Sequence, residues 1–220
     1  MARGRAQRIG IWVIAIAMLI GTFASFLAII LAPQNEAIDQ ARINELTTKY
    51  QDAYALYQDR VSAQATTLSN EYFASFSQYG SRVAPFDAAA VTELKKEDLV
   101  IGTGADITAD TSFSAYYIGW NPSGTVFDQS VEGDTLKAPL AVSPGSVIAG
   151  WGEGVVGMKV GGVRELTIPA NLAYGETGSG DNIPPNTPLK FILMIIPTPE
   201  VIAQPEIPQE LLEYYQRGTF

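Results

Sequence analysis

Cysteine and histidine are both absent from the 220 residues of the chain. Without cysteine the chain can form no disulfide and offers no thiol nucleophile. Without histidine it can build neither a Ser-His-Asp triad nor a histidine-bound zinc site. What remains is the chemistry of carboxylates, tyrosine, lysine or serine, or a form of catalysis that transfers no proton.

Basic residues are scarce beyond the first eight positions. The chain has 14 lysines and arginines against 23 acidic residues, which gives a net charge of −9. Arg3, Arg5 and Arg8 account for three of the basic residues, and without them 11 basic and 23 acidic residues leave −12. Because an acidic surface repels phosphate groups, we expect no binding to nucleic acid.

Charge is missing altogether from residues 9–32, a run of 24 mostly apolar residues. As a helix this run would extend over roughly 36 Å, enough for a hydrocarbon core of about 30 Å. It is longer than the apolar part of a cleaved signal peptide, which is about 7–15 residues. The sequence therefore predicts a cytoplasmic tail (1–8) and an uncleaved transmembrane anchor (9–32). Because the three arginines precede the run, we expect a single-pass plasma-membrane protein whose later residues are extracytoplasmic.

Neither glycine nor proline occurs between Pro33 and Gly80, which favours a long helix. Apolar residues recur about every 3.6 positions, the period of an amphipathic helix. They are Ile43, Leu46, Tyr50, Tyr54, Tyr57, Val61, Ala65, Leu68 and Tyr72. We predict a helical stalk and hinge over 33–85, with the helix over 35–75. Two interpretations stay open: a stalk that forms a homodimer or docks on the following domain, and a spacer helix that lies on its own domain.

Glycine and short alternating apolar runs dominate the next segment, residues 86–198. The runs at 113–118, 163–168 and 189–196 have the period of two that is typical of antiparallel strands. A short helix interrupts them near Trp151, and we expect Ser146 to cap it. The predicted fold class is α+β, an antiparallel sheet wrapped around one short helix. A proline-rich tail (199–220) follows, with a helix over 209–216 that begins after Pro208.

Six segments of this predicted domain resemble motifs of the FKBP-type peptidyl-prolyl cis-trans isomerases. The most specific is VIAGWGEGV at 147–155, which is similar to V-I-x-G-W-x-E-G-[VL] in that family. The other segments are 116–119, 124–130, 157–162, 168–175 and 182–189. The resemblance implies an FKBP-like fold and an isomerase that acts on X–Pro bonds of polypeptides. Such an enzyme needs no metal and no cofactor, so the missing histidine and cysteine are no obstacle.

The resemblance also implies a set of site residues. The catalytic candidates are Tyr117, Phe127, Asp128, Trp151 and Tyr174. The substrate-binding candidates are Val147, Ile148, Ile183 and Phe191. Trp151 would form the floor under the prolyl ring, Tyr174 and the Ile148 N–H would donate to a substrate carbonyl, and Asp128 would orient the twisted amide or bond Tyr117.

Two departures from the family pattern lie beside this set. The family's arginine a few residues after the Phe-Asp pair is missing, and 131–133 reads Val-Glu-Gly instead. A second pocket phenylalanine has no match, and Leu136, Ala138 or Leu140 stands in its region.

Together these features predict a membrane-anchored prolyl isomerase that assists the folding of exported or membrane-associated proteins at the outer face of the membrane. The alternative is a catalytically weak FKBP-fold module that acts in binding, as a chaperone or as an envelope scaffold. The missing arginine keeps this alternative open.

Overall fold

The computed structural model describes residues 40–217, and these form two compact units. The larger unit runs from Tyr57 to Ala203, and the smaller one joins the described residues up to Leu56 with those from Gln204 onward. The predicted cytoplasmic tail (1–8) and transmembrane anchor (9–32) lie outside the described residues. Within residues 40–217, every helix is too short or too polar to cross a membrane.

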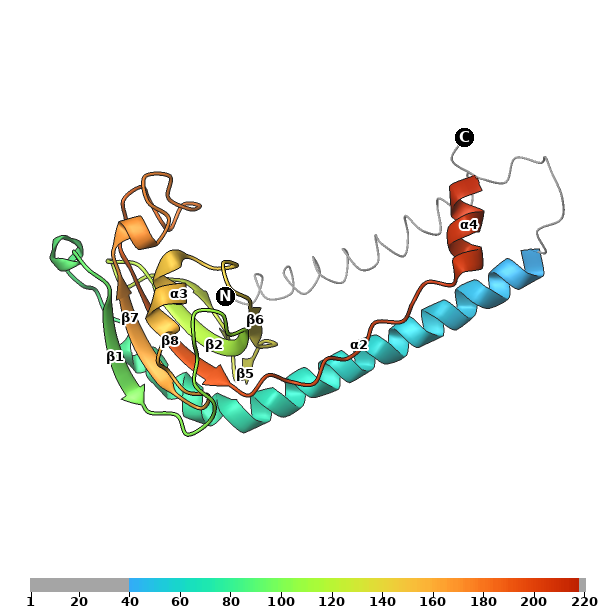
Figure 1. The fold of residues 1–220 in the computed structure, drawn as a ribbon, viewed down its shortest axis with the longest axis horizontal. Helices are drawn as coiled ribbons and strands as arrows, with labels where there is room; N and C mark the ends of the chain where they lie inside the picture. Colours follow the sequence, from blue (N-terminus) through green and yellow to red (C-terminus); the bar gives the residue numbers. More distant parts are fainter. Residues whose placement is uncertain (1–39, 218–220) are drawn as a thin grey trace. The chain divides into compact units, whose positions relative to one another are not determined.

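Within residues 40–217, a long helix is followed by a mostly β segment and a short helix (Figure 1). The elements are α2 (Gln40–Ser77), the 3₁₀ helices η1 (Gln78–Arg82) and η2 (Ala88–Ala90), β1 (Lys95–Val100), β2 (Phe113–Trp120), β3 (Val126–Gln129), β4 (Val131–Glu132), β5 (Thr135–Leu136), β6 (Leu140–Val142), α3 (Ala149–Val155), β7 (Val163–Ile168), the 3₁₀ helix η3 (Ala170–Leu172), β8 (Leu189–Ile196) and α4 (Gln209–Arg217). The long helix is confirmed as α2, and the predicted C-terminal helix is found as α4.

One antiparallel sheet organises the larger unit. Its strand order is β1-β7-β8-β2-β3, and β6 pairs with β2 beside this path. The helix α3 packs on one face of the sheet, and its residues Trp151 and Val155 belong to the core there. This confirms the predicted fold class, an antiparallel sheet with one short helix.

The central strand β8 is buried on both faces, because successive side chains of a strand point to opposite sides of the sheet. Phe191, Leu193 and Ile195 belong to the core cluster on the α3 side. Ile192, Met194 and Ile196 belong to a second cluster on the other side. None of these six side chains is more than 6% exposed. A strand buried in this way requires a second layer of structure over the face that α3 does not cover.

The C-terminal part of α2 supplies that second layer. Phe76 is fully buried, and its ring centroid lies 6.0 Å from that of Tyr116 on β2. The Ser69 hydroxyl accepts a hydrogen bond of 2.8 Å from the Leu136 N–H. Just beyond the helix, the Trp120 indole donates to the Ala84 carbonyl at 3.1 Å. The predicted domain of residues 86–198 therefore lies inside a larger compact unit, and its boundaries remain a prediction.

A buried carboxylate ties η1 to the same face. Glu165 on β7 is 6% exposed. Its two oxygens each lie 2.8 Å from a cation, one from Arg82 Nε in η1 and one from Lys190 Nζ on β8. Because a buried charge is costly without partners, these ion pairs fix the end of the helical segment on the sheet.

Tyr116 on β2 has a hydroxyl with no hydrogen-bond partner among the described residues, although it is buried. Burial, followed by the charges of Tyr72 and Glu71, raises the pKa of Tyr116 from 10.0 to about 12. The unfolded chain therefore loses this proton first as the pH rises. The stabilisation that depends on the neutral phenol is complete below pH 10 and is lost towards pH 12.

We expect Tyr116→Phe to stabilise the protein by about 1 kcal/mol at neutral pH, because it removes an unpaired buried hydroxyl. It should also weaken the loss of stability above pH 10. Urea unfolding at pH 8 and pH 11 would measure both effects. Tyr72, whose pKa is likewise raised to about 12, remains in the variant, so the pH dependence should shrink rather than vanish. A destabilised variant with an unchanged pH dependence would contradict this account.

The stripe of nine apolar residues predicted along α2 lies on its covered side, since each is buried or half-buried. In the larger unit, the extended chain after β8 runs beside this helix, and Gln64 Nε2 donates to the Glu200 carbonyl at 2.8 Å (Figure 1). The C-terminal part of α2 therefore lies on the following domain, which is compatible with both a docking stalk and a spacer helix. The homodimer through residues 35–75 stays a prediction.

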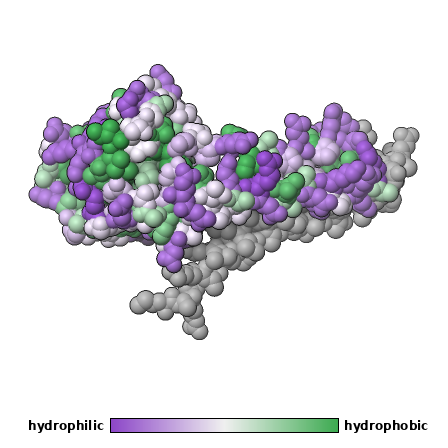
Figure 2. Space-filling model, turned by 90° about the horizontal axis from the view of Figure 1, so that it is seen from below, coloured by the Kyte–Doolittle hydropathy of each residue, from purple (hydrophilic) through white to green (hydrophobic). Residues whose placement is uncertain are grey.

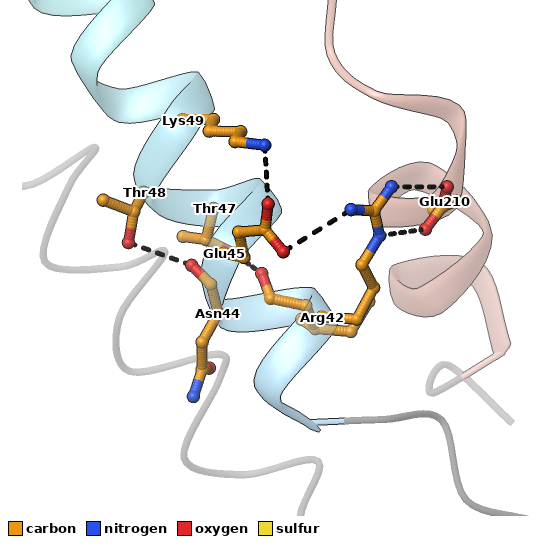
Figure 3. A network of polar contacts seen from close by, with 8 residues as sticks. Arg42, Asn44, Glu45, Thr47, Thr48, Lys49 and Glu210 are labelled. Atoms are coloured by element: carbon orange, nitrogen blue, oxygen red, sulfur yellow. Dashed lines mark hydrogen bonds and ion pairs between the residues drawn. The ribbon is translucent and has the colours of Figure 1, made fainter.

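In the smaller unit, α4 packs against the start of α2. Leu211 is 1% exposed and joins Ile43 and Leu46 in a small apolar cluster. At its edge, the Arg42 guanidinium lies between Glu45 of its own helix and Glu210 of α4 (Figure 3). The Arg42–Glu210 pair is exposed to solvent on both sides, so the apolar cluster is the main source of stability here.

Leu211→Ala should detach α4, because truncating a buried leucine costs about 2–5 kcal/mol. Glu210→Gln is the matched control on the neighbouring residue and should change little, because its ion pair is screened by water. Limited proteolysis of the full chain would compare the cleavage rates within residues 209–217. Equal cleavage of the two variants would show that α4 is not held by the cluster.

Large apolar side chains reach the surface at several separate places. Among the large apolar residues of the described part of the chain, Ile101 and Val201 are the most exposed, at 79% and 86%. On the face shown in Figure 2, hydrophobic patches alternate with hydrophilic surface. Single exposed apolar residues are normal on folded proteins and imply no binding site by themselves.

Candidate functional site

A cavity of about 270 Å³ opens between α3, the sheet and the neighbouring loops. Eight of the nine predicted site residues line it: Tyr117, Phe127, Asp128, Val147, Ile148, Trp151, Tyr174 and Phe191. Leu140 and Ser146 complete the lining. Residues from four strands, one helix and two loops therefore meet at one place.

Four aromatic rings form the inner wall of the cavity. The indole of Trp151 is 4% exposed, and its centroid lies 5.4 Å from the ring of Tyr117 and 5.2 Å from that of Phe191. Phe127 packs on Phe191 at 5.5 Å. All three pairs meet edge to face, an arrangement favoured by the quadrupoles of the rings. The result is an apolar box in which Trp151 and Phe191 are each 4% exposed.

Gly119 on β2 makes room for two of these rings. A Cβ atom at this position would lie 2.5 Å from the Phe191 ring and 2.9 Å from the Phe127 ring. Such distances are shorter than any normal carbon contact, so only glycine allows the two phenylalanines to approach the strand. The glycine in the Tyr-Tyr-Ile-Gly segment is therefore part of the site, although the sequence analysis did not assign it a role.

Tyr117 and Asp128 form the polar edge of the box. The Tyr117 hydroxyl donates to Asp128 Oδ2 at 2.5 Å, and the Gln129 N–H donates to Oδ1 at 2.8 Å. Burial first, and then the hydrogen bond to and charge of Asp128, hold the pKa of Tyr117 well above its usual range. Tyr117 therefore stays a hydrogen-bond donor at neutral pH. Of the two predicted roles for Asp128, the bond to Tyr117 is present in this structure.

Three donors of the site have no partner within residues 40–217. They are the Tyr174 hydroxyl, the Ile148 N–H and the Trp151 indole N–H. Tyr174 is 39% exposed, so its hydroxyl is accessible from solvent. A bound peptide could accept hydrogen bonds from Tyr174 and Ile148 without displacing an internal bond.

Ile183 does not line the cavity. It is 5% exposed and belongs to the core on the α3 side. Gly178 and Gly180 adopt positive φ angles of 70° and 56°, and the Ser179 N–H bonds the Ile183 carbonyl at 2.8 Å. This tight turn directs Ile183 into the core, and its predicted part in substrate binding stays a prediction.

Two residues near α3 differ from expectation. Ser146 does not cap the helix: its hydroxyl accepts from the Ser143 N–H and donates to the Ser143 carbonyl, while Ile148 occupies the N-cap position without a side-chain bond. The predicted cap was therefore wrong, because a local turn uses the serine first. Leu140 is the residue that faces the cavity where the family phenylalanine is missing, whereas Leu136 is buried on the α2 side.

No group of three or more acidic side chains in residues 40–217 is arranged to hold a metal ion. The site consists instead of aromatic walls, one hydrogen-bonded tyrosine–carboxylate pair and unpaired donors. These are the features of a pocket that binds a short apolar peptide segment.

The sheet around one helix, with an aromatic pocket between them, defines the chain as a protein of the FKBP-like class. A sequence model described as "FKBP-type peptidyl-prolyl cis-trans isomerase" matches residues 104–196. The "FK506-binding protein" of Neisseria meningitidis serogroup A is 42% identical over 97 residues, which cover 43% of this chain and 86% of that protein. The chain therefore belongs to the FKBP-type peptidyl-prolyl cis-trans isomerase family, which confirms the predicted enzyme class.

Further relatives match this chain over a similar length. "FK506-binding protein 4" of Dictyostelium discoideum is 43% identical over 105 residues, which are 47% of this chain but only 28% of that protein. The crystal structure of AtFKBP13 has 34% identity, covers 48% of this chain and 93% of its own, and gives a TM-score of 0.43. In each case about half of this chain is matched.

Proposed function

We propose that the cavity lined by Trp151 and its neighbouring rings binds a prolyl residue and catalyses cis-trans exchange of the preceding peptide bond. The observation that carries this proposal is the convergence of eight residues implied by the family resemblance on one cavity of about 270 Å³. Trp151 forms the floor, and Tyr117, Phe127 and Phe191 form the walls. Tyr174 and the Ile148 N–H bind carbonyls of the substrate backbone.

The chemistry follows from amide resonance. Rotation about an X–Pro bond breaks this resonance and takes tens to hundreds of seconds without a catalyst. The planar amide is more polar than the twisted one, so water favours the planar form. A pocket with apolar walls removes that preference and stabilises the twisted transition state relative to the ground state. A barrier lowered by about 7 kcal/mol gives roughly 10⁵-fold acceleration.

The Tyr117–Asp128 pair supplies the polar element of this mechanism. The carboxylate accepts the Tyr117 hydroxyl and so fixes the orientation of that ring, while burial and then the carboxylate hold the pKa of Tyr117 above its usual range. In the absence of the family's arginine, Tyr117 and the Gln129 N–H are the groups that hold Asp128 in place. The pair thereby shapes one side of the pocket, and no proton needs to move.

NMR exchange spectroscopy of a panel of X–Pro peptides with the full chain in mild detergent would test the activity. We expect exchange well above the uncatalysed rate, insensitive to chelators and thiol reagents. No acceleration at micromolar enzyme would remove the catalytic claim. Binding of the same peptides without acceleration would favour the second candidate, a binding or chaperone module, which the missing arginine beside Asp128 supports.

We further propose that the isomerase acts on exported or membrane-associated proteins at the outer face of the membrane. The support is the uncharged run 9–32, preceded by three arginines and followed by Glu36 and Asp39. Fractionation of cells that express the full chain or residues 34–220 would test the anchor. External protease should digest the isomerase region in spheroplasts, and a protected region or a soluble full chain would contradict the proposal.

A further inference from the structure

The helix that carries the pocket floor is intrinsically weak. α3 has only seven residues, and three of them are glycines, at 150, 152 and 154. Each glycine inside a helix costs roughly 1 kcal/mol relative to alanine, and an isolated helix of this length is unstable in water. The N-cap residue Ile148 adds no side-chain hydrogen bond. The position of α3 must therefore be set by the surfaces on which it lies.

The strand β7 provides such a surface through three alternate residues that point to the same face of the sheet. A Cβ atom on Gly150 would overlap the side chain of Ile168, and one on Gly154 would overlap Leu166. Both of these β7 residues are fully buried. The next alternate residue towards the start of β7 is Arg164, which lies at the C-terminal end of α3.

The Arg164 guanidinium binds the end of α3 directly. Its Nη1 donates to the carbonyls of Gly154 at 2.7 Å and Val156 at 3.2 Å. Carbonyls at the end of a helix have no partner within the helix, and a cation there also complements the helix dipole. Arg164 is 6% exposed, so these bonds are formed away from bulk water.

Asp98 on β1 fixes the orientation of this guanidinium. Its two oxygens accept from Arg164 Nε at 2.6 Å and Nη2 at 3.1 Å, and the two residues are register partners in the sheet. A planar fork held on two sides in this way has a defined position, which a lysine could not reproduce. Lys96, two residues earlier on β1, donates to the Glu153 carbonyl and supports the same end of the helix.

The position of α3 determines the depth of the pocket. Trp151 lies on the helix, whereas Tyr117 and Phe191, against which its indole packs, lie on β2 and β8. A shift of α3 along β7 would therefore move the floor of the pocket against its walls.

We propose that Arg164, oriented by Asp98, is a positioning residue that holds Trp151 at its place in the pocket. The inference deepens the proposed function, because it rests on the role of Trp151 as the floor. Arg164 does not touch the pocket and acts only through the carbonyls at the end of α3.

The test is Arg164→Gln in the full chain, with Arg82→Gln as the matched control. Arg82 also pairs with two carboxylates, Glu165 and Glu97, but on the α2 side of the sheet and with a side chain that is 39% exposed against 7% for Arg164. We expect Arg164→Gln to lower kcat/KM by roughly ten- to a hundredfold, as small displacements of a binding surface do. The indole N–H resonance of Trp151 should shift while that of Trp120 stays in place. Arg82→Gln should lose stability without either change.

Unchanged kcat/KM and an unchanged Trp151 resonance in folded Arg164→Gln would overturn the proposal. If this variant does not fold, Asp98→Asn replaces it, because it keeps the arginine but removes the charged partner. We then expect the Trp151 indole resonance to shift and kcat/KM to fall several-fold. An unchanged resonance together with an unchanged kcat/KM would again overturn the inference. Trp151→Leu separates the two proposals. If this variant keeps full activity, the assignment of the pocket itself is wrong. If Trp151→Leu is inactive while Arg164→Gln is fully active, only the role of Arg164 is refuted.

Discussion

A fragment of residues 86–203 should show no cooperative thermal unfolding, whereas residues 57–203 should unfold in one transition. The shorter fragment lacks the part of α2 that covers the second face of the sheet. Tyr116, Ile118, Trp120 and Ile192 are at most 1% exposed there. Exposing large buried side chains costs about 1.5–3 kcal/mol each, so the sum approaches the 5–15 kcal/mol by which a typical domain is stable.

A longer fragment and a mixture of two fragments test the same prediction. Residues 40–203 should behave like residues 57–203, because residues 40–56 contribute nothing to the cluster on the α2 side of the sheet. A mixture of the 86–203 fragment with a synthetic α2 peptide of residues 57–85 should recover part of the helical signal in circular dichroism. If residues 86–203 melt at the same temperature as residues 57–203, the α2 layer is dispensable and the predicted boundary at residue 86 holds.

Gly150→Ala should destabilise the protein by about 1–3 kcal/mol and reduce isomerase activity as well, because it overpacks a filled core. The new methyl group would overlap the Cγ2 atom of Ile168. Ile168 is fully buried and β-branched, so its side chain cannot rotate away. The helix must then lift from β7, and Trp151 moves with it. Differential scanning calorimetry and peptide exchange rates would measure the two effects.

Gly152→Ala is the matched control two residues away on the same helix. No atom lies within 4 Å of a Cβ at this position, so the alanine meets open space. It should raise stability by up to about 1 kcal/mol through helix propensity alone and leave the activity unchanged. Equal effects of the two substitutions would mean that close packing on Ile168 does not place α3.

The pocket could be predicted from the sequence because its residues fall in short motifs of fixed spacing. Tyr117, Phe127 and Trp151 each stand in such a motif, and the structure brings them together. Ile183 could not be placed in this way, because the tight turn around Gly178 and Gly180 decides which side of the loop it faces. A sequence motif gives the order of residues in a loop but not the path of its backbone.

The second layer over the sheet was only partly predictable. The apolar stripe of α2 indicated a covered side. The run at 189–196 was interpreted as an alternating strand, although its residues 191–196 are all apolar, which is typical of a strand buried on both faces. The residue pattern did not specify that α2 would cover this face of the sheet, because an apolar helix stripe can pack on any apolar face of similar width. The hydrogen bonds of Arg164 at the end of α3 could not be predicted either, because their acceptors are main-chain carbonyls, which every residue type has.

The chain enters and leaves the larger unit through segments that do not line the cavity. The polypeptide enters this unit along α2 and leaves it along the same helix, where Gln64 bonds the Glu200 carbonyl. Both covalent connections therefore depart from the face of the sheet opposite to α3. Within this unit, neither α2 nor the extended chain after β8 lines the cavity around Trp151.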